Sequence, residues 1–358
     1  MENGQKIDIL GLLPDELSAL CASLGQPSYR AKQIFAALSR GTAIGDISSL
    51  PITFRETLKD MTVWRLPTVE RKLVSRIDGT VKYLFRLYDG ECVESVLMQY
   101  EHGSSLCISS QVGCRMGCAF CASTIGGKVR DLYASELLGQ VIAAACDSGK
   151  RIDGIVMMGI GEPLDNYENV VRFLRLVGHK DGVNIGYRHI SLSTSGIVPA
   201  IDRLAKENFP ITLSISLHAV TDEGRSAIMP VNRKWGIRAL LDACVRYYRT
   251  TGRRLSFEYT LLAGKNDSDA DADALAALLK NAFSPIHAPI HVNLIRVNEV
   301  KETSFVRGEA ESAKRFAERL CRRGVNATVR RRLGADINAA CGQLRRAHRA
   351  EEGRSEES

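Results

Sequence analysis

The fold of this chain is organised around one stretch of sequence, Cys114-Arg115-Met116-Gly117-Cys118-Ala119-Phe120-Cys121. Three thiolates at the spacing CxxxCxxC can bind three irons of a cubane cluster and leave the fourth iron open to a small molecule. A structural zinc site needs four ligands, usually in two pairs, and no second pair lies nearby. Three unligated core cysteines are the remaining alternative, which a glycine-containing loop disfavours. We therefore expect a [4Fe-4S] cluster on Cys114, Cys118 and Cys121.

From about residue 104 onward, predicted strands alternate with predicted helices, and the cysteine stretch follows directly on the first strand. The strands are Leu106–Ser110, Ile155–Met158, His189–Ser193, Thr212–Leu217, Leu255–Leu262 and Val292–Val297. The helices cover about 134–147, 166–177, 198–206, 236–250, 268–282 and 309–323. Six such units predict an α/β fold whose parallel sheet curls into a partial (β/α)6 barrel. An open doubly wound sheet is the alternative, and a seventh strand could run through Ala327–Arg331.

The first hundred residues have a different character. Short helices are predicted to about residue 65, starting at Pro14 and after Ser28 and Pro51. Residues 70–99 alternate as strands do, and Asp78-Gly79 indicates a hairpin turn. We expect a small helical accessory domain with connecting strands at 1–90, a barrel at 100–335, and a C-terminal segment with a charged tail at 336–358.

The composition is that of an ordinary globular protein. Of the 358 residues, 45% are hydrophobic and 25% are charged. No run of about 18 apolar residues exists, and the N-terminus does not resemble a signal peptide, so we expect a cytoplasmic protein without a membrane span. Ten cysteines in such a protein argue against a structural disulfide framework.

Positive charge is concentrated near the C-terminus. The formal net charge is +7, and between Lys314 and Arg349 basic residues far outnumber the two acids, Glu318 and Asp336. A concentrated basic surface favours a polyanion such as nucleic acid. A solvated helix face followed by a basic tail would give the same count, so charge alone leaves both interpretations open.

Polar or glycine-rich residues follow several of the predicted strands. In barrels of this kind, the chemistry lies at the carboxyl ends of the strands. Glycine lets a backbone approach a ligand closely, a carboxylate accepts from an ammonium group, and serine or asparagine can bind ribose hydroxyls. Each residue taken alone could be a helix cap or a turn residue, but together they predict one pocket above the cluster. The candidates are Gly161, Glu162, Ser193, Ser195, Ser216, Leu217, His218 and Asn298.

The cysteine loop, with Phe120 as its aromatic residue, resembles the signature of the radical-SAM superfamily. More closely, the chain resembles the bacterial radical-SAM methyltransferases that methylate carbon 2 of an adenine in 23S rRNA and in tRNA. The matching stretches are Val93–Val96, Ser105–Ser123, Val156–Asn166, Ser191–Pro199, Ile215–Ala219, His291–Ile295 and Gly334–Leu344. The resemblance implies a partial barrel, a [4Fe-4S] cluster and S-adenosylmethionine as cofactors, and an N-terminal domain that helps to grip RNA.

The resemblance also implies a role for individual residues. Cys341 would be methylated and carry the transferred carbon, Cys107 would form a transient disulfide with it to release the product, and Glu94 would accept a proton. Carbon 2 of adenine is electrophilic, so its methylation by a radical route needs two cysteines outside the cluster and a base. The alternative is that Cys341 and Cys107 are buried structural thiols and that Glu94 is an exposed carboxylate of a strand. The S-adenosylmethionine contacts would be Gly161, Glu162, Ser193, Ser216, Leu217, His218 and Asn298.

One departure concerns which carbon is methylated. A sister group methylates carbon 8 of the same ribosomal adenine, and Arg296 resembles that group, whereas Val112 resembles the carbon-2 group. We favour carbon 2. Basic residues of the C-terminal half would contact phosphates, a flavodoxin-type or other protein would donate electrons, and we expect a monomer.

Two other classes remain as alternatives. A non-catalytic iron–sulfur protein that binds RNA would need the cluster and the basic surface but not Cys341 or Cys107. A radical-SAM enzyme acting on a protein or a small molecule, such as a glycyl-radical activase, would need neither the paired cysteines nor the basic surface.

Overall fold

The computed structural model describes residues 6–297, 305–337, 344–346 and 348. Its helices are α1 (Pro14–Ser23), α2 (Tyr29–Leu38), α3 (Ile52–Met61), α4 (Ala134–Ser148), α5 (Tyr167–Val177), α6 (Val198–Lys206), α7 (Asp222–Ile228), α8 (Ile237–Thr251), α9 (Asp269–Phe283) and α10 (Ala310–Arg322). Its strands are β1 (Ile7–Asp8), β2 (Thr62–Val63), β3 (Thr68–Val74), β4 (Val81–Arg86), β5 (Cys92–Tyr100), β6 (Gly103–Cys107), β7 (Gln111–Gly113), β8 (Lys128–Asp131), β9 (Gly154–Met157), β10 (Ile190–Thr194), β11 (Thr212–Ser216), β12 (Leu255–Leu261), β13 (Ile290–Arg296) and β14 (Asn326–Val329).

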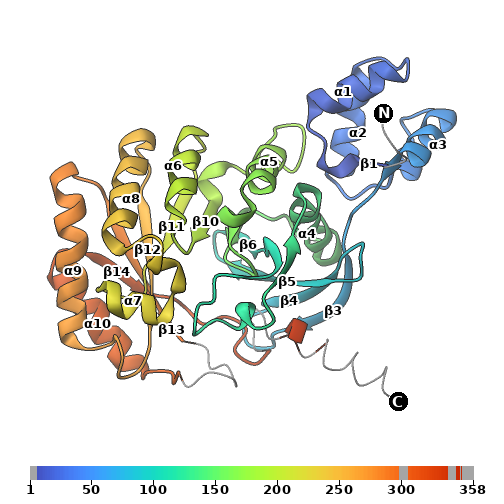
Figure 1. Ribbon diagram of the computed structural model, residues 1–358. Helices are drawn as coiled ribbons and strands as arrows, with labels where there is room; N and C mark the ends of the chain where they lie inside the picture. The colour runs from blue at the N-terminus through green and yellow to red at the C-terminus, as the bar shows by residue number, and fades with distance from the viewer. Residues whose placement is uncertain (1–5, 298–304, 338–343, 347, 349–358) are drawn as a thin grey trace.

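A curved sheet runs through the whole molecule (Figure 1). Within the described residues it has 10 strands in the order β14-β13-β12-β11-β10-β9-β6-β5-β4-β3. In this order, the neighbouring strands β14, β13, β12, β11, β10, β9 and β6 pair in parallel. The strands β5, β4 and β3 then extend the sheet as antiparallel neighbours. The predicted partial barrel is therefore confirmed, with β14 as a further parallel strand.

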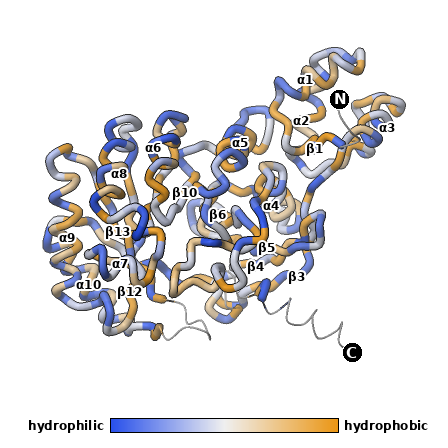
Figure 2. The backbone as a smooth tube through the Cα atoms, in the orientation of Figure 1, coloured by the Kyte–Doolittle hydropathy of each residue, from blue (hydrophilic) through white to orange (hydrophobic). Residues whose placement is uncertain are grey.

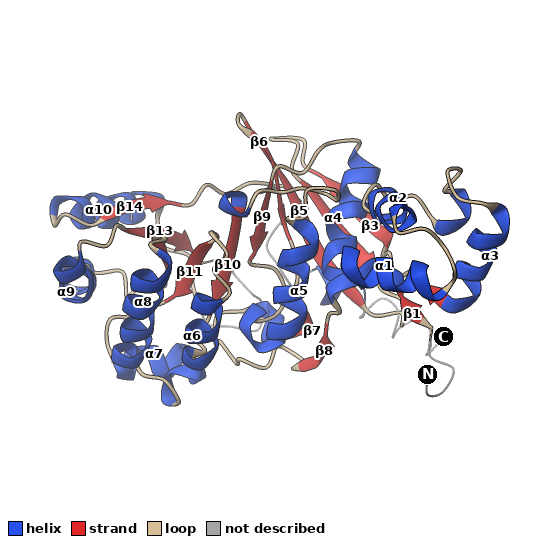
Figure 3. Ribbon diagram, turned by 90° about the horizontal axis from the view of Figure 1, so that it is seen from above, coloured by secondary structure: helices blue, strands red, loops and turns tan. Residues whose placement is uncertain are grey.

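Helices cover the outer face of this sheet. Viewed from above, α4, α5, α6, α8, α9 and α10 lie along one side of it (Figure 3). These helices mix hydrophobic and hydrophilic colours along their length (Figure 2), as expected for helices with one buried face. The strands beneath them contribute a row of buried apolar residues on a single face, such as Leu213, Phe257 and Leu294, which the strand register places on the same side.

The N-terminal helices α1, α2 and α3 lie at one end of the molecule, and α9 and α10 lie at the other (Figure 1). Pro14 occupies the first turn of α1, and the Glu16 carboxylate accepts a hydrogen bond from the Leu13 amide at 2.7 Å. Arg172 on α5 fastens this part to the barrel, because its Nε donates to the Gly11 carbonyl at 2.7 Å.

The predicted helix and strand positions agree with the structure to within a few residues, but one helix and the short strands β1, β2, β7 and β8 were not predicted. Helix α7, after β11, was not predicted, although Thr221 caps it by accepting a hydrogen bond from the Gly224 amide at 3.1 Å. None of the described helices is long and apolar enough to cross a bilayer.

Candidate active site

The cysteine loop begins where the short ribbon of β7 and β8 ends. The Cys114 amide donates to the Gly127 carbonyl at 3.0 Å, and the Ala119 amide donates to the Ile228 carbonyl, at the end of α7, at 2.9 Å. Gly113 has φ of 79°, and a Cβ placed there would lie 2.0 Å from the Gly127 carbonyl oxygen. Only glycine fits at this position, so the backbone itself sets the direction in which the loop leaves the ribbon.

Asp165 holds the cysteine loop against the neighbouring strand end. Its carboxylate accepts hydrogen bonds from Arg115 Nε at 3.1 Å, Lys128 Nζ at 2.9 Å and Gln111 Nε2 at 2.8 Å. Burial alone would raise the pKa of Asp165, but the two cations and the amide hold it below its usual range. The side-chain carbonyl of Gln111 also accepts from the Glu162 amide at 2.9 Å, so Gln111 links the cysteine loop to the strand end that carries Glu162.

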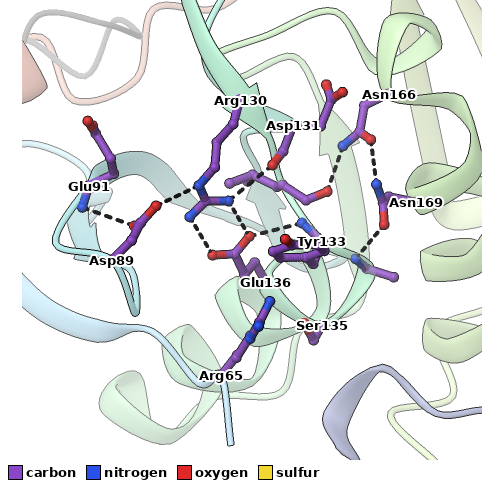
Figure 4. Close-up of polar contacts among 12 residues, drawn as sticks. Arg65, Asp89, Glu91, Arg130, Asp131, Tyr133, Ser135, Glu136, Asn166 and Asn169 are labelled. Carbon is purple, nitrogen blue, oxygen red and sulfur yellow. Dashed lines mark hydrogen bonds and ion pairs between the residues drawn. The ribbon is translucent and has the colours of Figure 1, made fainter. Parts of the chain in front are cut away.

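A second polar network supports β8 from the other side (Figure 4). Arg130 binds both carboxylate oxygens of Glu136 at 2.7 and 2.8 Å, and its Nε donates to Asp89 at 2.6 Å. Asn166 donates to the Leu132 carbonyl at 2.7 Å and accepts from Asn169 at 2.8 Å. The ribbon that precedes the cysteines is thus tied to α4 and α5 by bidentate and charge-assisted hydrogen bonds.

A cavity of about 210 Å³, here called the cofactor cavity, lies beside the cysteine loop at the carboxyl ends of the strands. Its walls combine the three cysteines with most of the residues predicted from the strand ends. These wall residues include Cys114, Cys118, Cys121, Gly161, Glu162, Ser193, Ser195, Ser216 and His218. The Leu217 side chain is instead buried in the hydrophobic core, and Asn298 lies outside the described residues.

The three cysteines fit an iron–sulfur cluster better than a single metal ion. In the described part of the chain, no three His, Cys, Asp or Glu side chains converge on one ion. A cubane needs no such convergence, because each thiolate binds a different iron. Burial raises the pKa of Cys114 to about 12 and also raises that of Cys118. Such buried thiols become stable anions when a metal replaces their protons.

The wall of the cofactor cavity also has the properties of a ligand site. Gly161 lines the cavity with φ of 110°, and a Cβ there would lie 2.7 Å from the Gln111 amide nitrogen, so only glycine lets the backbone pack against Gln111 at this wall. The buried Ser195 hydroxyl has no hydrogen-bond partner among the described residues. Buried hydroxyls are as a rule hydrogen-bonded, so a hydroxyl without a protein partner on this wall is suited to bind a polar ligand.

Glu162 and His218 are fully buried and held by backbone amides. The Glu162 carboxylate accepts from the Ser195 amide at 2.6 Å and the Leu164 amide at 3.0 Å, while burial raises its pKa. Burial lowers the pKa of His218 to about 3, so its imidazole is neutral. Its Nδ1 accepts from the Thr260 amide at 2.9 Å, which places the proton on Nε2.

The predicted catalytic residues Glu94 and Cys107 lie on one face of the sheet. Cys107 pairs in register with Val96, two residues after Glu94, so the two side chains point the same way. Glu94 is not exposed: it is 1% accessible, and its Oε2 lies 3.0 Å from Lys82 Nζ.

The C-terminal segment packs on this same face. The Arg345 amide donates to Glu94 Oε1 at 2.7 Å, and Leu344 contacts the cluster formed by Leu84 and Cys92. Cys341 lies outside the described residues, three positions before Leu344 in the sequence. No disulfide joins two described residues.

A larger groove of about 890 Å³, here called the basic groove, opens at the amino ends of the strands. It adjoins the cofactor cavity, and Met158, Glu258 and Arg330 line both. Several other cationic side chains line it, whereas its acids are few. Its arginines are Arg151, Arg188, Arg254 and Arg330, and its acids are Glu258 and Asp153, which pairs with Arg151 at 3.5 Å. The lining His291 has its pKa lowered by burial.

The basic residues near the C-terminus divide into two sets. Arg319 and Arg323 on α10 both pair with Asp273 on α9 at 2.7 Å, so they stabilise helix packing. Arg330, Arg331 and Arg332 are exposed. The prediction of a polyanion-binding surface therefore applies to only part of the charge counted from the sequence.

The comparisons with known proteins agree with this geometry. The model of the radical SAM superfamily matches residues 108–277. A probable dual-specificity RNA methyltransferase RlmN from Alkaliphilus oremlandii is 47% identical, covering 96% of this chain and 99% of the relative. The corresponding protein of Clostridium acetobutylicum is 48% identical, covering 95% and 97%. A radical SAM methyltransferase from Sphaerobacter thermophilus superposes with a TM-score of 0.88 at 43% identity, covering 94% of this chain and 98% of that one.

A partial parallel barrel with three cysteines beside a cavity at its strand ends defines a radical-SAM enzyme, with a [4Fe-4S] cluster and S-adenosylmethionine as its cofactors. The match over nearly the full length of both chains is more specific. The chain belongs to the RlmN family of radical-SAM RNA methyltransferases.

Proposed function

We propose that this protein methylates carbon 2 of an adenine in 23S rRNA and of an adenine in tRNA. One observation carries the proposal beyond the superfamily. Leu344 and Arg345, which follow Cys341 closely in the sequence, pack on the sheet face of Cys107 and Glu94, and this contact supports the proposal. A radical-SAM enzyme without a carrier cysteine has no need of this arrangement.

The cofactors have clear positions in this proposal. Cys114, Cys118 and Cys121 hold the cluster, and Gly161, Glu162, Ser193, Ser216, Leu217, His218 and Asn298 are the residues that we assign to S-adenosylmethionine. When bound, the cluster supplies an electron that splits S-adenosylmethionine into methionine and a 5′-deoxyadenosyl radical. Leu217 would act through its backbone, because its side chain faces the core.

The chain's own residues carry out the remaining steps. The Cys341 thiolate takes a methyl group from one molecule of S-adenosylmethionine and holds it for coupling to the adenine ring. Glu94 accepts the proton that leaves carbon 2; its carboxylate lies on the sheet face of Cys107 and is paired with Lys82. The Cys107 thiolate then attacks the Cys341 sulfur. A transient disulfide forms, the bond between sulfur and the transferred carbon breaks with its electron pair passing into the adenine ring, and the carbon takes up a proton to become the methyl group.

RNA would approach through the basic groove. Arg188 and Arg254 are exposed at its wall and form no ion pair among the described residues, so they can bind phosphates. The target adenine must leave its stack to pass Met158 and Arg330 into the cofactor cavity. Helices α1 to α3 would grip the RNA farther from the target, which fits our division of the chain at 1–90, 100–335 and 336–358.

Three further assignments belong to the same proposal. The protein would work in the cytoplasm, where its RNA substrates are. A flavodoxin-type or other electron donor would reduce the cluster. The protein would act as a monomer, since each site named here is built from one chain.

The test is to incubate the cluster-loaded protein with unmodified 23S rRNA and tRNA, S-adenosylmethionine and a reductant, and to digest the RNA for mass spectrometry. We expect 2-methyladenosine in both RNAs. The matched control is Cys341→Ala, which should keep the iron content and lose the methylated nucleoside. A second control is Cys321→Ala, since Cys321 is exposed on α10 and has no part in the scheme.

Two outcomes would contradict the proposal in different ways. Formation of 8-methyladenosine would make this protein a carbon-8 enzyme, the alternative favoured by Arg296. Absence of any methyladenosine, with normal cleavage of S-adenosylmethionine, would leave a radical-SAM enzyme with another substrate.

A further inference from the structure

Arg225, on the unpredicted helix α7, is completely buried. Four hydrogen bonds fix its guanidinium. Nε donates to the Leu217 carbonyl at 3.0 Å, and Nη1 donates to the Asn232 amide oxygen at 3.0 Å. Nη2 donates to the carbonyls of Ser195 at 2.6 Å and Ser216 at 2.9 Å.

All of these acceptors are neutral. Among the described residues, Arg225 has no carboxylate within ion-pair distance, and Asp222 is linked to it through Asn232, which donates to Asp222 Oδ1 at 3.0 Å. Burying a cation without a counter-charge costs several kcal/mol, so buried arginines are as a rule paired with an anion. An anion that binds near Arg225 would supply what the polypeptide does not.

The cluster site lies beside this cation. The Ala119 amide, between Cys118 and Cys121, is bonded to the carbonyl of Ile228, three residues after Arg225 on the same helix. Burial lowers the pKa of Arg225 to about 10, which leaves it charged at neutral pH, and the Cys118 thiolate opposes that decrease. The negative charge of three thiolates exceeds the positive charge of the oxidised four-iron core, so the ligated cluster is an anion. Its reduction adds a further negative charge.

Arg225 also joins two walls of the cofactor cavity. Ser195 follows β10, and Ser216 and Leu217 end β11, so one side chain fixes the carbonyls of both strand ends. Ser195 and Ser216 line the cavity. With their carbonyls turned toward Arg225, the orientation of these peptide groups toward the cavity is set before any ligand binds.

We propose that Arg225 is a positioning residue with two tasks: it provides the buried positive charge opposite the iron–sulfur cluster, and it holds the β10 and β11 ends in the arrangement that binds S-adenosylmethionine. The charge favours the reduced, more negative cluster, and therefore raises its reduction potential. The proposal concerns the cofactors alone and does not depend on the RNA substrate.

The two tasks separate in two variants. Arg225→Met removes both the charge and the hydrogen bonds, whereas Arg225→Lys keeps the charge and cannot reach four acceptors at once. Both are measured as anaerobic, cluster-loaded protein by a redox titration followed by electron paramagnetic resonance. Binding of S-adenosylmethionine is followed by the change that it causes in the spectrum of the reduced cluster.

We expect Arg225→Met to lower the midpoint potential of the cluster and to weaken S-adenosylmethionine binding roughly tenfold or more. Arg225→Lys should keep the wild-type potential and still bind S-adenosylmethionine more weakly. Arg172→Met is the control. It removes an arginine of α5 that also donates to a backbone carbonyl, that of Gly11, and it should change neither the midpoint potential nor the affinity for S-adenosylmethionine.

A folded Arg225→Met protein with wild-type potential and affinity would overturn the proposal. A potential in Arg225→Lys as low as that in Arg225→Met would refute the charge task. Wild-type affinity in Arg225→Lys would refute the positioning task. If Arg225→Met does not fold, as thermal unfolding of the metal-free protein would show, Arg225→Lys and its two readouts decide both tasks.

Discussion

Lys82 and Glu94 form an ion pair of 3.0 Å on adjacent strands, and each side chain is only 1% exposed. Because side chains alternate along β4, Lys82 points to the other face of the sheet from Tyr83 and Phe85. An isolated sheet would turn that face to solvent. That face is covered by the C-terminal segment, and the Arg345 amide adds a hydrogen bond to the same carboxylate. The pair therefore links the base assigned to the reaction with the segment that carries Cys341.

Removing Lys82 should destabilise the protein strongly. Lys82→Met removes the cation that lies 3.0 Å from the buried Glu94 carboxylate, which costs about 3–5 kcal/mol in the free energy of unfolding. The double variant Lys82→Met with Glu94→Gln removes both charges, and should recover a large part of that loss. Denaturant unfolding of the metal-free proteins measures both values.

The control for this cycle is the surface pair of Lys59 and Glu56, at 3.0 Å with side chains 47% and 60% exposed. Lys59→Met should cost less than about 1 kcal/mol, because water screens an exposed pair. Equal losses for Lys82→Met and Lys59→Met would show that the buried pair contributes no more than a surface one.

Neutralising the basic groove should weaken RNA binding without affecting the cofactors. The double variant Arg188→Gln with Arg254→Gln should make the slope of log affinity against log salt concentration shallower, by the amount expected for the loss of about two phosphate contacts. Cleavage of S-adenosylmethionine in the absence of RNA should be unchanged, because neither arginine lines the cofactor cavity.

The matched control for the groove is Arg322→Gln, which removes an exposed arginine from the outer helix α10. Its affinity and salt slope should equal those of the wild type. If the groove variant also keeps the wild-type slope, RNA approaches by another surface.

The sequence predicts most of this architecture because local patterns determine it. Strand and helix periodicity located the barrel units, and the CxxxCxxC spacing located the cluster loop. Lys82 could not be predicted as buried, because it is paired with Glu94 on the neighbouring strand, and Glu94 in turn accepts from the Arg345 amide 251 residues away in the chain. Arg225 was missed for a similar reason: three of its four acceptors are backbone carbonyls at two strand ends, which no residue type reveals.

The same limit applies to the charge count. Arg319 and Arg323 belong to the stretch that predicted a polyanion surface, yet Asp273 on α9 takes up both. Their partner lies about one barrel unit earlier in the chain, so composition alone could not separate them from the exposed arginines at 330–332.

The neutral state of His218 should appear in the pH dependence of stability. Its pKa is about 3 in the folded protein and about 6.5 when unfolded, so the unfolded chain binds a proton that the folded chain excludes. The contribution is fully present above pH 6.5 and is lost as the pH falls toward 3, at about 1.4 kcal/mol per pH unit.

His218→Asn isolates this contribution. An Asn oxygen can accept from the Thr260 amide, and asparagine tolerates the left-handed backbone at this position, where φ is 57°. Unfolding of the metal-free variant between pH 7 and 5 should depend less steeply on pH than that of the wild type. Parallel curves for the two proteins would mean that His218 is protonated in the fold.

The release step predicts a trapped protein–RNA adduct. In Cys107→Ala, Cys341 can still be methylated and coupled to the adenine, but no thiolate remains to attack the Cys341 sulfur, so the covalent link persists. A denaturing gel of the reaction should show a shifted band that ribonuclease removes. Cys92→Ala is the matched control, because Cys92 is another buried cysteine, on the neighbouring strand β5 and on the same sheet face, and should release its product normally. Normal turnover by Cys107→Ala without adduct would make Cys107 a core thiol packed on Val96 and Met98, and would assign product release to another residue.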